Sequence, residues 1–204
     1  MNPIEFGTSA IDKAMANYKG TISLTQQMAG QGGTANAAQT GTANQQQGIF
    51  ANAQNTGGDA SGKVSQATQM AYSWLDAKQS STQNTGLASQ AGQVNKAVAQ
   101  KRPPVVVRDL GEGTNAQTNG SSVTINQRYA EKSSVGSIAA SILHEFNHIA
   151  FGGGDKADET RAESFAEMFR DDNGIGKFNS QQDVTAWTNK NYSNLAEDGV
   201  NFFA

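Results

Sequence analysis

The stretch Ser141-Ile142-Leu143-His144-Glu145-Phe146-Asn147-His148-Ile149-Ala150 decides the interpretation of this chain. It contains the pattern H-E-x-x-H, and all the remaining residues of the stretch are uncharged. Residues four apart lie on one face of an α-helix, so His144 and His148 can direct their imidazoles at a single metal ion. Glu145 lies about 100° further round the helix, where it can act on a water as general base. The pattern predicts a Zn²⁺ site on a helix.

Composition restricts the third ligand of that site. His144 and His148 are the only histidines of the chain, and cysteine is absent. A catalytic zinc site needs three protein ligands and one open position, so the remaining ligand must be a carboxylate. Without cysteine no disulfide supports the fold, and redox chemistry assigns no compartment.

A glycine turn separates the motif from a second predicted helix. The run at 152–154 ends the first helix and permits a tight reversal, because glycine adopts positive φ without penalty. Asp155 or Asp158 then caps the second helix. So short a turn makes the two helices antiparallel neighbours, which brings the middle of the second opposite the end of the first.

Three glutamates share one face of the second helix. Glu159, Glu163 and Glu167 are spaced four apart. We predict Glu163 as the third zinc ligand, and Glu167 as the carboxylate that accepts the remaining N–H of a histidine ring. The alternative is a solvated acidic face, which repulsion between like charges four residues apart disfavours.

These residues carry a family resemblance. H-E-x-x-H followed by E-x-x-x-[D/E] resembles the gluzincin zinc metallopeptidases, and the stretch at 162–170, A-E-S-F-A-E-M-F-R, is similar to the catalytic domain of anthrax lethal factor and related bacterial toxin peptidases. The resemblance implies a zincin-like fold, with Glu163 as the third ligand. Two departures are that Asn147 stands where the family has glycine, and that the connection between the two helices is much shorter. The family's catalytic tyrosine, just ahead of the ligand glutamate, has no counterpart between residues 149 and 162.

The remaining composition narrows the class of protein. The 204 residues allow one domain or a small domain with an appendage, and the net charge of -3 gives no reason to expect a nucleic-acid partner. No run approaches the ~18 apolar residues of a membrane span. The start of the chain lacks the basic and apolar regions of a signal peptide, so we expect export by a signal-peptide-independent route.

We predict an α+β protein in two parts: a helical, partly disordered N-terminal region, residues 1–102, and a small zincin-like domain, residues 103–204. A helix is expected over 8–29. The Gly, Ala, Gln and Asn tract at about 30–62 has too few apolar residues to offset chain entropy, which indicates a linker; a loosely packed helix is the alternative. Apolar stripes then predict two helices between residues 61 and 101.

Strand signals begin after Pro103 and Pro104. The valines at 105–107 and the alternating stretch 121–126 read as strands, with Asn119-Gly120 as a turn. We expect 121–126 to be an edge strand that receives an extended substrate; an internal hairpin strand is the alternative. Ser133 or Ser134 should cap the motif helix. Ser180 should open a last helix, and the terminal aromatics at 202–203 should cover the core.

These predictions define a mechanism. Glu145 takes a proton from the water that attacks a peptide carbonyl, and a further donor faces the oxyanion. With no spare histidine, Tyr129, Tyr192 and Arg161 remain as donors, and we rank the tyrosines equally. A buried ring with a bonded hydroxyl is the alternative role of each tyrosine.

We therefore expect a zinc metalloendopeptidase that cleaves a protein or peptide substrate. The polar leader resembles that of secreted bacterial effectors or toxins, which makes secretion machinery or a chaperone the expected partner of the N-terminal region and a host or target cell the expected destination. One alternative is a cell-wall peptide hydrolase. The other is a structural or virion-associated protein with a non-catalytic zinc site.

Overall fold

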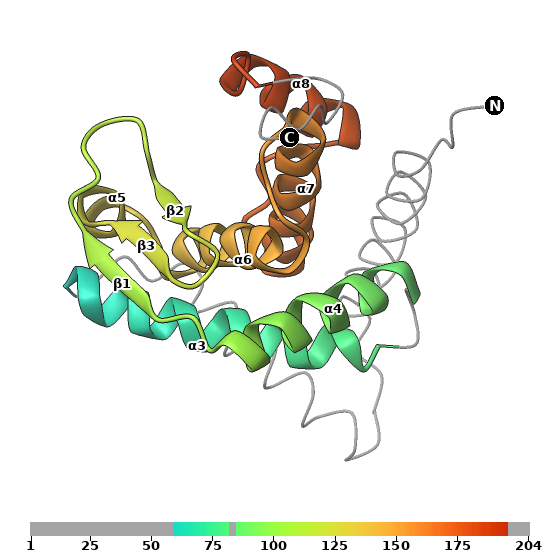
Figure 1. The fold of residues 1–204 in the computed structure, drawn as a ribbon, viewed down its shortest axis with the longest axis horizontal. Coiled ribbons are helices and arrows are strands. Elements are labelled where there is room, and N and C mark those ends of the chain that lie inside the picture. The colour runs from blue at the N-terminus through green and yellow to red at the C-terminus, as the bar shows by residue number, and fades with distance from the viewer. Residues whose placement is uncertain (1–58, 82–84, 196–204) are drawn as a thin grey trace, which may run out of the picture.

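A long apolar helix, α6 (Val135–Phe151), lies at the centre of the structure, with other elements packed around it (Figure 1). The computed structural model describes residues 59–81 and 85–195. The predicted helix over 8–29, most of the predicted linker and the terminal aromatics lie outside these residues. The predicted linker extends too far, because Asp59 already caps α3 (Ala60–Gln79) by accepting the Gly62 N–H at 2.7 Å.

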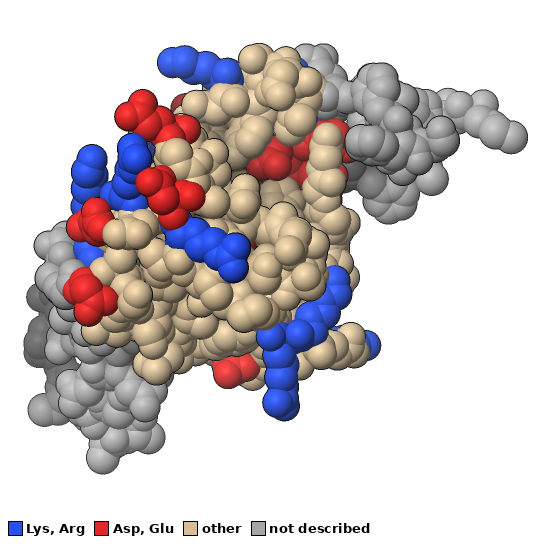
Figure 2. Space-filling view, turned by 60° about the vertical axis from the view of Figure 1, so that its left-hand side comes forward, with Lys and Arg blue, Asp and Glu red and all other residues tan. Residues whose placement is uncertain are grey.

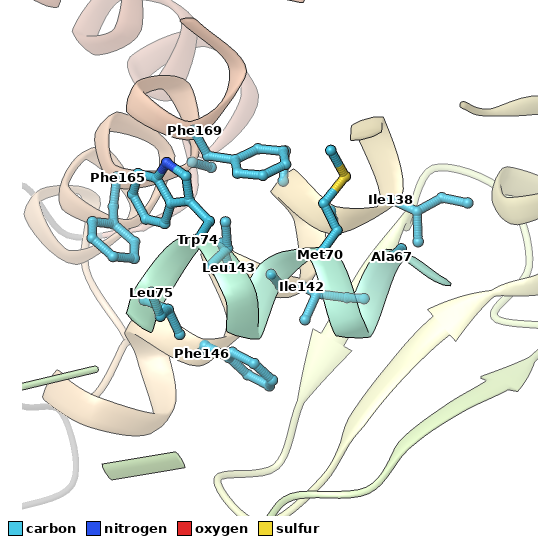
Figure 3. Packing of buried hydrophobic residues seen from close by; sticks show 14 of the residues in the cluster. Ala67, Met70, Trp74, Leu75, Ile138, Ile142, Leu143, Phe146, Phe165 and Phe169 are labelled. Carbon is cyan, nitrogen blue, oxygen red and sulfur yellow. The ribbon is translucent and has the colours of Figure 1, made fainter. Parts of the chain in front are cut away.

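Two helices before residue 102 pack on α6. They are α3 and α4 (Thr85–Lys101), as the apolar stripes predict. Although composition changes at Pro103-Pro104, the buried side chains on both sides of this point form one hydrophobic core. Trp74 of α3 lies between the rings of Phe165 and Phe169 at centroid distances of 5.2 and 5.8 Å (Figure 3). The helices preceding the motif therefore support the motif helix directly.

The sheet has three short strands: β1 (Val105–Arg108), β2 (Ala116–Thr118) and β3 (Val123–Asn126). Their order is β1-β3-β2, with β1 parallel and β2 antiparallel to β3. The Asn119-Gly120 turn joins β2 to β3, and Gly120 has a φ of 81°. The prediction that residues 121–126 form an edge strand is wrong, because β3 pairs with β1 on one side and with β2 on the other. The edge strand beside α6 is β2.

Side-chain caps begin the remaining helices where the sequence predicts them. Ser134 caps α6, Asp155 caps α7 (Lys156–Asp172) and Ser180 caps α8 (Gln181–Asn191), each accepting the backbone N–H three residues later. The short α5 (Gln127–Lys132) follows β3. The chain is thus of the α+β class. The small sheet lies at one end of α6, and the helices α7 and α8 lie at its other end (Figure 1).

Charged side chains of both signs lie on the surface of the described residues (Figure 2). Lys and Arg side chains are interspersed with Asp and Glu on the face shown in Figure 2. Within the described ranges, no helix is both long enough and apolar enough to span a bilayer.

Candidate metal centre

His144 and His148 lie one turn apart on α6, and their Nε2 atoms are 3.0 Å apart. The two rings meet edge to face, with centroids 4.7 Å apart. Both side chains are about nine-tenths buried. The i, i+4 spacing thus brings two imidazole nitrogens to one point, as the sequence predicts.

The third group at this point is Glu159, in the first turn of α7. Its Oε2 lies 3.2 Å from His144 Nε2, and its Oε1 lies 3.4 Å from His148 Nε2. Ligand atoms of a tetrahedral zinc site, each bonded at about 2.0–2.1 Å, lie about 3.3 Å from one another. The observed separations match that triangle, so the group of His144, His148 and Glu159 could hold a metal ion.

The charges around this point favour a cation. Burial alone would raise the pKa of Glu159, but hydrogen bonds with both histidines outweigh it and lower the pKa to about 2. Burial would likewise lower the pKa of His144, yet the carboxylates of Glu159 and Glu163 raise it to about 9. Positive charge is therefore stabilised where the three groups meet.

The structure places Glu163 differently from the prediction. Its Oε2 accepts a hydrogen bond from Nδ1 of His144 at 3.2 Å, on the side of the ring that faces away from His148 Nε2. Its Oε1 lies 2.9 Å from Arg170 Nη1. The reason is the length of the glycine turn, which brings the first turn of α7, not its middle, opposite the end of α6. Glu159 thus takes the position predicted for Glu163.

The role predicted for Glu167 is in turn taken by Glu163. Glu167 is fully buried, and its Oε1 accepts the backbone N–H groups of Lys177 and Phe178 at 2.5 and 2.7 Å. Its other oxygen lies 3.0 Å from Arg170. Glu167 therefore fixes the segment after α7, and Glu163 is the carboxylate that orients a histidine ring.

The glycine turn orients the second histidine. Nδ1 of His148 donates to the carbonyl of Gly152 at 3.2 Å, and Arg161 Nη2 donates to the same carbonyl at 3.2 Å. A Cβ at Gly153 would lie only 2.6 Å from His148 Nδ1. With both Nδ1 atoms occupied as donors, loss of the Nε2 protons would leave the Nε2 lone pair of each ring at the common point, where a metal ion would replace those protons.

Glu145 lies beside this group and is 7% exposed. Burial raises the pKa of Glu145, while the two histidines and the backbone N–H of Thr118 act in the opposite direction. Thr118 belongs to the edge strand β2, so the strand and the carboxylate are in direct contact. A glutamate with a raised pKa can hold a proton that an exposed one would release.

Two cavities meet at the metal group, which consists of His144, His148 and Glu159. Both are bordered by Ala116, His144, Glu145 and Tyr192. One, of about 480 Å³, follows β2 and the glycine turn. The other, of about 800 Å³, extends between the loop before β2, the first half of α6, and α8. The metal group is therefore accessible from two sides.

The two predicted tyrosines have different surroundings. The hydroxyl of Tyr129 donates to the carbonyl of Ser137 at 2.9 Å and contacts Ser141 Oγ at 3.1 Å. Tyr192, which follows α8, borders both cavities; burial and then the nearby carboxylate of Glu159, with which it forms a hydrogen bond, raise its pKa. Arg161, the third predicted donor, is bound to the glycine turn and borders neither cavity.

Sequence reasoning missed two features of the site. A capping residue at Asp155 puts Glu159 directly after the turn, and this signal could have selected Glu159 over Glu163. Ser133, Ser137 and Ser141 precede Glu145 at steps of four and line the larger cavity. That spacing was visible in the sequence.

Comparisons with protein-family models, curated proteins and solved structures found no match. The functional argument therefore rests on the residues and geometry of the site.

Proposed function

We propose that the chain is a zinc-dependent endopeptidase of the zincin-like class. The observation that carries this proposal is the convergence of His144 Nε2, His148 Nε2 and the Glu159 carboxylate within 3.0–3.4 Å of one another. Two imidazoles and a carboxylate, with space left for a further ligand, are the donor set of many catalytic zinc sites. When bound, Zn²⁺ polarises a carbonyl and acidifies water.

Glu145 is the general base in this proposal. It borders both cavities next to the metal group, and burial raises its pKa. It accepts a proton from the attacking water and returns it to the nitrogen of the departing amine. The hydrogen bond from the Thr118 N–H keeps the carboxylate directed toward the edge strand.

Tyr192 is the better supported donor to the oxyanion. It lies at the junction of the two cavities, beside Glu159. Each tyrosine hydroxyl has a partner, but that of Tyr192 is the proposed metal ligand Glu159, whereas that of Tyr129 is the backbone of α6 at Ser137, so we assign Tyr129 to positioning of α6. The donor thus comes from the segment after α8, whereas the toxin peptidases have theirs just ahead of the ligand glutamate.

An extended peptide fits along β2. This strand pairs with β3 on one side, and Ala116, Gln117 and Thr118 border the cavities on the way to Glu145. A substrate that adds as a further strand would pass the metal group with chain on both sides of the reacting bond. Cavities on both sides favour cleavage within a chain over removal of a terminal residue.

The accessible metal group favours an enzyme over a structural zinc site, in which protein atoms fill all four positions. The site defines the substrate only as a peptide. A cell-wall peptide therefore stays an alternative to a protein substrate. Export without a signal peptide, and binding of secretion machinery or a chaperone, stay predictions about residues outside the described part.

The test compares zinc content and peptide hydrolysis in wild type and Glu145→Gln. We expect one zinc per chain in both proteins and a loss of about 10²–10⁴-fold in kcat for the variant. Glu112→Gln, which changes a carboxylate with a 95% exposed side chain, is the matched control. Equal activity of wild type and Glu145→Gln, or a wild type that binds no zinc, would refute the proposal.

A further inference from the structure

The larger cavity shares Glu145 and His144 with the metal centre. A group that enters this cavity during the proposed reaction must therefore be attached close to the bond that is cut. At about 800 Å³ the cavity is large enough for a long side chain. Its lining should thus determine which residue the enzyme accepts beside that bond.

One wall of the cavity is polar. It consists of hydroxyl groups from the end of α5 and the first half of α6, namely Tyr129, Ser133, Ser137 and Ser141. Tyr129, Ser137 and Ser141 bond to one another or to the chain beside them, and each hydroxyl oxygen can still accept a further hydrogen bond that an apolar side chain would not supply. The wall favours a substrate group that forms hydrogen bonds.

Two cations also line the cavity, and one of them, Arg170, is already paired with carboxylates of the protein. Its guanidinium lies 2.9 Å from Glu163 and 3.0 Å from Glu167, and its side chain is 12% exposed. Arg170 is therefore part of the support for His144. It has its carboxylate partners within the protein.

Lys177 has a different environment. Its ammonium lies 3.4 Å from Glu163 Oε1, an oxygen that Arg170 approaches more closely, and its side chain is 40% exposed. The ammonium sits 3.7 Å from the centre of the Trp187 ring, which also borders the cavity. The indole holds the cation in place without neutralising it. Lys177 can therefore donate to a further anion in the cavity.

We propose that the larger cavity binds a carboxylate of the substrate beside the reacting bond, with Lys177 as the cation that receives it. This inference rests on the proposed function. Lys177 repels a basic side chain that approaches Trp187, whereas Arg170 adds little repulsion because it is paired with Glu163 and Glu167. The carboxylate can come from an aspartate or glutamate within the substrate or from the C-terminus of a short peptide.

The test uses a library of quenched peptides that vary at each position around the cut bond, with blocked and with free C-termini. Wild type should prefer aspartate or glutamate at one position adjacent to the bond in blocked peptides, or a free carboxylate at that distance. Lys177→Met should lower kcat/KM for the acidic peptides by about ten- to hundred-fold, the value of one charge-assisted hydrogen bond. The loss for neutral peptides should be smaller than the loss for acidic peptides, so the ratio of kcat/KM for acidic over neutral peptides should fall.

Lys190→Met is the matched control, because it removes the same charge from an exposed residue of α8 that does not line the cavity. A second measurement is independent of turnover: binding of uncleaved acidic peptides to Glu145→Gln, followed by fluorescence anisotropy, should weaken when Lys177→Met is added. A preference for apolar or basic residues, or an acidic preference that survives Lys177→Met, would overturn the inference alone. A wild type that binds zinc but cleaves no peptide would remove the proposed function and this inference with it.

Discussion

Replacing Glu159 and Glu163 one at a time by glutamine tests which carboxylate holds the metal. The glutamine side chain keeps the size of glutamate and removes its charge. Glu159 approaches both Nε2 atoms at 3.2 and 3.4 Å, whereas Glu163 approaches the His144 ring from its Nδ1 side. The first substitution should remove a metal ligand, and the second should weaken only the orientation of one ligand.

The two expected effects differ in size. Loss of a group that orients a ligand costs about 10–100-fold in metal affinity, which corresponds to about 1.4–2.7 kcal/mol. We therefore expect Glu163→Gln to weaken zinc binding within that range and Glu159→Gln to weaken it further than about 100-fold. Arg170 keeps Glu167 as a partner in Glu163→Gln, so the fold should persist.

The assay is competition for zinc with a chromophoric chelator, with thermal unfolding of each metal-free variant as the control for folding. The reverse order, in which Glu163→Gln loses zinc and Glu159→Gln retains it, would refute the geometric argument. It would instead support the ligand set that the resemblance to toxin peptidases implies.

Three further predictions follow from the same contacts. Gly153→Ala should weaken zinc binding by at least about 10-fold, because its Cβ would lie 2.6 Å from His148 Nδ1; chelator competition measures this, and unchanged affinity would contradict it. Tyr192→Phe should lower kcat by about 10²–10³-fold with little change in thermal stability, because Tyr192 is the proposed oxyanion donor. Tyr129→Phe should lower the melting temperature more, because it loses the hydrogen bond to Ser137. The opposite pattern in kinetics and melting would reverse the two assignments. Trp74→Ala should lower the free energy of unfolding by about 3–5 kcal/mol in denaturant titrations, and a change below about 1 kcal/mol would show that α3 is not part of the core.

The sequence predicted the helices around the site well, because their signals are local. The caps at Ser134, Asp155 and Ser180 and the positions of His144 and His148 need only the helical period and the nearest residues. None of these depends on how the chain packs over long distances.

The errors arose where distant segments meet. The strand β2 has the sequence Ala-Gln-Thr, which carries little strand propensity and is set by pairing with β3. The choice between Glu159 and Glu163 depends on which turn of α7 the short glycine turn brings opposite the end of α6, and the role of Glu167 depends on the segment that follows α7. Tyr192 reaches the site only because α8 folds back on α7.

The shared core limits where the chain can be divided. The buried residues of α3 and α4 belong to the same cluster as Ile138, Ile142 and Phe146 of the motif helix. A fragment that starts at Pro103 would expose this face of α6 to water and should aggregate instead of folding. The smallest unit that folds independently should therefore retain α3 and α4 together with α6.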